Sequence, residues 1–217
     1  MDGRDRPRRP AILDPAEAEL IWGDSDPALA SEAAHATANA VVFGPSHLAG
    51  DEPLAERVGR IIDAEGLDEI AGLWSRSPAS TLPGALWRLY LLRAWLERDP
   101  ETIATRFRGG TEHTTPVELR EDDVENPRDA VVAPAPTVLG ERLSQLFSGT
   151  DETELAGLLE EAAAFLRVLA AGTGSDPGWR THDEEAAAPV TGRTGALTAT
   201  AAELDDAAAR ARAGRLD

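Results

Sequence analysis

The segment from Leu82 to Leu96 limits the possible folds of this chain more than any other part of the sequence. Eleven of its fifteen residues are apolar, among them Trp87, Tyr90 and Trp95. A helix that spans a bilayer needs about 20 predominantly apolar residues in a row, and this segment is shorter and interrupted by two arginines. We therefore expect a helix that is buried on nearly every side and forms the central axis of a folded domain.

Helix start and stop signals surround this central segment. Ser80 or Thr81 is expected to cap the central helix, and Asp99-Pro100 is expected to end it and start the next one. Apolar periodicity, Asp-Pro starts and glycine stops predict the remaining helices at 16–22, 26–42, 53–66, 67–74, 99–110, 137–149 and 151–172. No stretch has a clear strand pattern. The prediction is an all-α fold, a single helical domain of five to seven helices around the central one.

Composition separates this domain from its appendages. The domain is predicted at residues 14–172, after a disordered N-terminus at residues 1–13. Residues 111–137 hold seven acidic residues, two arginines and four prolines, which predicts a flexible acidic insertion. Residues 173–217 are rich in Ala, Gly, Thr and Asp, so we expect a low-complexity, disordered tail, or a frayed helix that orders against a partner.

The segment from Leu155 to Leu169 has the clearest amphipathic pattern in the sequence. Its leucines and Phe165 recur at helical spacing, so they lie on one face of a helix. Such a face must be covered by another apolar surface. We expect the central helix to cover it, with a homodimer interface as the alternative or an additional role.

The residue types that are missing exclude several kinds of chemistry. The sequence has no cysteine, so it has no thiol nucleophile, disulfide or thiolate metal site. All 21 basic residues are arginine, so the standard lysine of a phosphate-binding loop or of a Schiff base is missing too. Together with the lack of a recognisable catalytic motif, this favours a protein that is not an enzyme and uses no cofactor.

The net charge of −18 bears on the kind of partner. An acidic chain repels phosphate backbones and anionic lipid, which argues against nucleic acid and membrane surfaces and favours a basic partner. The Arg-rich start lacks the apolar core of a signal peptide, and no stretch is long and apolar enough to span a membrane. The expected location is the cytoplasm.

Glu32 and His35 form the one pairing that suggests a metal site. They stand one helical turn apart, as in the Glu-x-x-His motif of di-iron carboxylate bundles. Those bundles need a second copy of the motif and two further glutamates, and the chain has no second copy. We therefore expect a polar helix face at this position and no metal.

A ligand pocket, if the protein has one, is predicted around the loop that contains Ser46 and His47. Adjacent residues rarely form a nucleophile and base pair, and the Gly-x-Ser-x-Gly pattern is missing, so we expect binding and no hydrolysis there. Aromatic and arginine side chains would complete such a pocket. The candidate binding residues are Ser46, His47, Trp74, Trp87, Arg88 and Tyr90.

Three stretches of sequence, "PSHLAGDEPLAERV", "EGLDEIAGLW" and "LPGALWRLYLLRAWLERDP", carry a resemblance to known proteins. They resemble an uncharacterised family of small proteins of high-GC bacteria. The resemblance covers roughly residues 40–108 and 138–172. It implies no activity and no catalytic residues, but it supports treating these blocks as the folded part.

Three functional hypotheses follow. The leading one is a non-enzymatic interaction or regulatory protein whose acidic segments bind another protein, in particular a basic one. The second is a helical protein, or an enzyme, that binds a small molecule near Ser46, His47 and the Trp- and Arg-bearing helix. The third is a transcription-associated helical regulator.

Overall fold

The computed structural model describes residues 27–44, 66–113, 131–148, 154–175 and 184–217, and within them the chain is all-α, as predicted. No strand occurs in these ranges. Residues 66–74 are helical as well. The other elements are α2 (Pro27–Phe43), α4 (Leu82–Arg98), α5 (Pro100–His113), α6 (Pro136–Ser148), α7 (Leu155–Ala171), the 3-10 helix η3 (Gly172–Ser175) and α8 (Glu184–Arg212).

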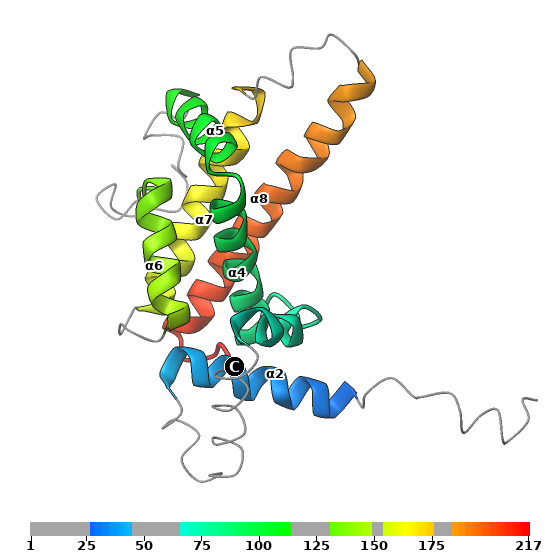
Figure 1. Ribbon diagram of the computed structural model, residues 1–217, viewed down its shortest axis with the longest axis vertical. Helices are drawn as coiled ribbons and strands as arrows, with labels where there is room; N and C mark the ends of the chain where they lie inside the picture. The colour runs from blue at the N-terminus through cyan, green and yellow to red at the C-terminus, as the bar shows by residue number, and fades with distance from the viewer. Residues whose placement is uncertain (1–26, 45–65, 114–130, 149–153, 176–183) are drawn as a thin grey trace, which may run out of the picture.

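Four of the helices, α4, α6, α7 and α8, form a bundle (Figure 1). Helix α2 crosses one end of this bundle, and α5 lies at the other end. Helix α4 contacts α2, α5, α6, α7 and α8, so its predicted central position is confirmed. One end of α8 extends beyond the bundle.

The ends of α4 are set by local hydrogen bonds. The hydroxyl of Thr81 accepts a hydrogen bond from the Gly84 backbone N–H at 3.3 Å, which identifies Thr81 as the predicted cap. The Leu82 N–H donates to the backbone oxygen of Asp217 at 2.8 Å. The first turn of α4 is therefore held by a contact from the far end of the sequence.

Burial of α4 is one-sided, so the prediction of a helix buried on nearly every side is wrong. Its buried side chains include five leucines at helical spacing, Leu82, Leu86, Leu89, Leu92 and Leu96. On the opposite side, Trp87, Tyr90 and Trp95 are only half-buried, and Leu91 keeps 46% of its surface exposed. Neighbouring helices cover one face of α4 and leave the aromatic side partly open.

Helices α7 and α8 form an antiparallel pair with heptad spacing. Thr194 contacts Thr173 through a 3.1 Å hydroxyl hydrogen bond, and residues further along α8 pair with earlier positions of α7. The core positions alternate three and four residues apart on both helices. They are Leu155, Leu159, Ala162, Leu166 and Leu169 on α7, and Leu197, Ala201, Leu204, Ala208 and Ala211 on α8.

The prediction that the central helix α4 covers the apolar face of α7 is therefore wrong. This face packs mainly on α8, with much less contact to the central helix α4. Ion pairs Arg167–Asp205 and Arg212–Glu160 join the two helices along the sides of this interface. The α7 face is thus covered by α8 within one chain.

The prediction of a disordered tail at 173–217 is also wrong for most of its length. Residues 184–212 are helical, and Ala201, Leu204, Ala207 and Ala208 are fully buried. The segment looked too poor in large apolar residues to fold by itself. Alanine fills the heptad core positions instead, and its small side chain lets α8 lie close to a leucine-rich partner.

Other predicted boundaries fall partly outside the described residues. The acidic insertion expected at 111–137 is shorter at both ends, because α5 continues to His113 and α6 begins at Pro136. Residues 114–130 within it lie outside the described ranges, as do the predicted N-terminus at 1–13 and the predicted helix at 16–22. Most of the helix predicted at 53–66 lies outside them too.

Two glycines let α5 approach the end of α7. A Cβ atom added to Gly110 would overlap the backbone oxygen of Val168, and one added to Gly172 would overlap the backbone oxygen of Arg106. Backbone cannot move aside as a flexible side chain can. These glycines are therefore required for the close contact between the two segments.

We predict that Gly172→Ala lowers the free energy of unfolding by about 1–3 kcal/mol, because the added methyl group overpacks this contact. Gly140→Ala is the matched control. A Cβ at Gly140 meets nothing, so alanine there should raise stability by about 0.5–1 kcal/mol through its higher helix propensity. Urea unfolding followed by circular dichroism measures both, and equal effects would contradict the close contact.

We also predict that Leu204→Ala destabilises the protein by about 2–5 kcal/mol, because Leu204 is fully buried between α8 and its neighbours. The exposed neighbour Ala202 provides the control, and Ala202→Ser should change stability by about 0.5 kcal/mol or less. Urea titration gives both values. A neutral Leu204→Ala variant would mean that α8 is not part of the core.

Candidate functional site

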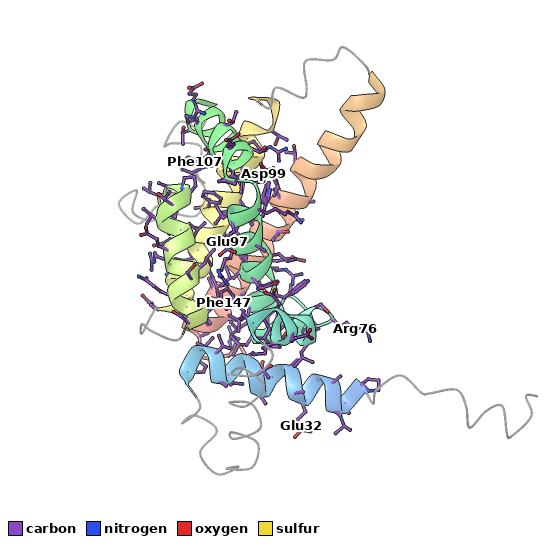
Figure 2. The ribbon with its side chains drawn as sticks, viewed as in Figure 1. Glu32, Arg76, Glu97, Asp99, Phe107 and Phe147 are labelled. Carbon is purple, nitrogen blue, oxygen red and sulfur yellow. The ribbon has the colours of Figure 1, made fainter. Side chains whose placement is uncertain are left out.

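The candidate binding residues that the structure describes do not share one pocket. Ser46 and His47 lie outside the described residues. Trp74 is fully buried, and its indole Nε1–H donates a 3.0 Å hydrogen bond to the hydroxyl of Thr37 on α2. Its ring also stacks near the ring of Phe147 of α6, a partly buried residue that is labelled in Figure 2. Trp74 therefore belongs to the core and lines no described pocket.

Trp87, Arg88 and Tyr90 lie on α4 but face two different surfaces. Trp87 and Arg88 line a groove between α4 and α8. Tyr90 lines a separate hollow on the other flank of α4, although its ring stacks on that of Trp87 with 5.6 Å between centroids. These three candidate residues thus lie on two surfaces that share an aromatic pair.

The groove between these helices, which we call the α4–α8 groove, has a volume of about 270 Å³. Helix α4 supplies most of its lining, α8 forms the opposite side, and α7 contributes Leu166. The lining residues are Trp87, Arg88, Leu91, Leu92, Trp95, Leu166, Leu197, Thr200 and Glu203.

Three large apolar side chains form a row in this groove. Trp87, Leu91 and Trp95 are spaced four residues apart, so they lie one above another on successive turns of α4. All three are partly exposed, because no helix among the described residues covers this face. This spacing was available in the sequence, yet Leu91 and Trp95 were not among the predicted site residues.

An ion pair joins the two sides of the groove. The Nε of Arg88 donates to Glu203 Oε2 of α8 at 2.6 Å, and its Nη1 donates to the Gly84 backbone oxygen at 2.9 Å. The Arg88 side chain is 20% exposed and that of Glu203 is 41% exposed. Glu203 is 115 positions away in sequence, which is why sequence analysis did not pair it with Arg88.

A second arginine, on α5, contacts the Trp95 ring of this row. The buried Arg106 of α5 places its guanidinium carbon 5.8 Å from the centroid of the Trp95 ring, within the range of a cation–π contact. This contact restricts the Trp95 ring in its half-buried position. The ring therefore forms part of a preformed surface.

Two further hollows flank the other side of α4. The polar groove has a volume of about 300 Å³ and is lined by Asp68, Tyr90, Arg93, Ala94, Glu97 and Arg98. The α4–α6 groove has a volume of about 540 Å³ and is lined by Arg93, Leu96, Glu97, Pro100, Pro136, Thr137, Gly140, Glu141, Ser144 and Gln145. Glu97, which is labelled in Figure 2, lies in the last turn of α4 and lines both grooves.

The polar groove contains the one described group with a clearly shifted pKa. Burial raises the pKa of Tyr90 above its ordinary value of 10.0. The hydrogen bond that its hydroxyl donates to Asp68 Oδ1 at 2.9 Å raises it further, as does the charge of that carboxylate. Arg93 acts in the opposite direction. Tyr90 therefore stays protonated and serves as a donor that holds Asp68 in place.

Glu32 and His35 do not converge on a metal-like site. Glu32 is exposed on the outer side of α2 (Figure 2), and the Nδ1 of His35 lies 2.8 Å from the backbone oxygen of Ser31. Within the described ranges, no three His, Asp or Glu side chains cluster in a way that could hold a metal ion. The pair forms part of a polar helix face.

Comparisons with known proteins leave the site to be interpreted from its geometry. No protein-family model, no curated protein and no solved structure matches the chain. In the described part of the chain, every helix is too short or too polar to cross a bilayer.

Tyr90 is the only tyrosine in the sequence, so its titration can be followed directly by the ultraviolet absorbance of the phenolate. We predict a pKa above 10.0, and a lower value in Asp68→Asn, which removes the neighbouring negative charge. Because the folded-state pKa is raised, the associated stabilisation is present below pH 10 and is lost as the pH rises through the folded-state value. Glu69→Gln, an exposed acidic neighbour, is the control and should leave the titration unchanged.

Proposed function

We propose that this chain is a non-enzymatic, cytoplasmic interaction protein that uses the α4–α8 groove to bind another protein. The observation that carries the proposal is the row of partly exposed Trp87, Leu91 and Trp95 in this groove. Large aromatic side chains dominate the binding energy of protein interfaces, especially in preformed hollows. An exposed row of this kind is costly in water unless a partner covers it.

The size of the groove favours side chains of a partner over a small molecule. Small-molecule sites enclose about 300–1,000 Å³ and bury most of their ligand. The α4–α8 groove is smaller, at about 270 Å³, and it is an open surface hollow. It suits a few apolar anchor residues of a larger partner.

The charged groups of the groove also favour binding over catalysis. Arg88 and Glu203 bind each other, and Arg88 additionally binds Gly84. A general base or nucleophile needs a partner aimed at the substrate, and here the two charged groups are used to join α4 to α8. Their contact positions the groove walls.

The α4–α6 groove supports a second candidate function, the binding of a small molecule. Its volume of about 540 Å³ falls within the usual range for ligand sites. Leu96, Pro100 and Pro136 supply apolar surface, and Ser144 and Gln145 supply polar groups. Its lining includes none of the candidate binding residues that the structure describes.

To test the leading proposal, tagged wild-type protein and Leu91→Glu are used to capture proteins from the native lysate, with quantitative mass spectrometry as the readout. Leu91 is 46% exposed, so the substitution should not unfold the domain, and it places a charge in the centre of the apolar row. We expect capture of the specific partner to fall about tenfold or more.

Leu73→Glu is the matched control, because Leu73 is also an exposed leucine, at 38%, and lines none of the three grooves. It should capture the same partner as the wild type. A partner set that is identical for Leu91→Glu and Leu73→Glu, or an empty set for the wild type, would refute the proposed function.

A further inference from the structure

We infer that the partner bound by the α4–α8 groove is an amphipathic helix with a basic residue placed to meet Glu203. This inference rests on the proposed function and adds the chemistry of the partner. Helix α4 presents the apolar row, and α8 presents Leu197, Thr200 and Glu203 on the opposite side. The groove thus provides one apolar wall and one acidic position.

The shape of the apolar row matches a helix. Trp87 and Trp95 are eight residues apart on α4, which corresponds to about 12 Å along the helix axis. Slightly more than two turns of a partner helix cover this length and present apolar residues at spacings of three and four. Such a helix would lie along the groove between α4 and α8 and cover Leu91.

The charged side chains of the groove indicate which charge the partner helix carries. Arg88 is the less exposed member of the ion pair, and two of its donor groups are already bound to Glu203 and Gly84. Arg106 is buried behind the Trp95 ring. The most exposed charge of the groove is therefore the carboxylate of Glu203, and an arginine or lysine of the partner can share it.

The electrostatic field of the whole chain also favours a basic partner. With a net charge of −18, the protein attracts a basic segment and repels an acidic one. It also repels a second copy of itself, which carries the same charge. A basic amphipathic helix therefore fits the groove better than either alternative.

The experiment uses two synthetic helical peptides of equal length with the same leucine face, one with arginine on its polar face and one with glutamate. Calorimetry and Trp fluorescence measure binding to the full chain at low and at physiological salt. We expect the arginine peptide to bind the wild type and the glutamate peptide to bind at least tenfold more weakly. Glu203→Gln should weaken the arginine peptide about three- to fivefold, the range of a partly exposed ion pair, and Leu91→Ala should weaken it about fivefold or more.

Glu97→Gln is the matched charge control. Glu97 is also ion-paired, to Arg93 at 2.9 Å, and its side chain is 58% exposed, but it lies outside the α4–α8 groove. Its loss should leave the affinity for the arginine peptide within about twofold. Urea unfolding of all variants separates a binding effect from a loss of the fold.

Each contrary result has a distinct meaning. Equal losses in Glu203→Gln and Glu97→Gln would overturn the inferred contact with Glu203, because only the general field would then attract the peptide. Equal binding of both peptides would overturn the basic character of the partner. If neither peptide binds while capture from the lysate still depends on Leu91, the inferred partner chemistry is wrong and the proposed function stands.

Discussion

The close packing of α8 on α7 is the constraint on which the rest of the structure depends. Leucines of α7 meet alanines and Leu204 of α8 at heptad positions, and small side chains at these positions let the two helices lie close together. The Thr173–Thr194 hydrogen bond and two interhelical ion pairs align the helices. Without α8, the apolar face of α7 would be exposed to water, and α4 would lose one side of its surroundings.

This packing also produces the candidate binding site. The stretch of α8 that packs on α7 also passes beside α4 (Figure 1), which brings Leu197, Thr200 and Glu203 opposite the row of Trp87, Leu91 and Trp95. The same contacts that close the core therefore create a groove at its edge. Arg88 contributes both to the packing and to the groove. It joins α4 to α8, and it leaves Glu203 as the more exposed charge of the groove.

The helices themselves could largely be predicted, because their signals are local. The cap at Thr81 and the Pro100 start appear in the structure as expected. The α8 helix was mistaken for a disordered tail, because large apolar residues are rare there. Its heptad pattern of Leu197, Ala201, Leu204 and Ala208 was present in the sequence but depends on a partner for its stability.

The sequence by itself determined the all-α class, the central position of the segment from Leu82 to Leu96, and the absence of cysteine and lysine chemistry. Each of these depends on residue type or on neighbours within a few turns of one helix. Only the tertiary structure decided that Trp74 is a core residue, that α4 is open on one side, and that Glu203 meets Arg88. These features depend on which helices lie side by side, and a pattern within one helix specifies which residues share a face but not which helix will cover it.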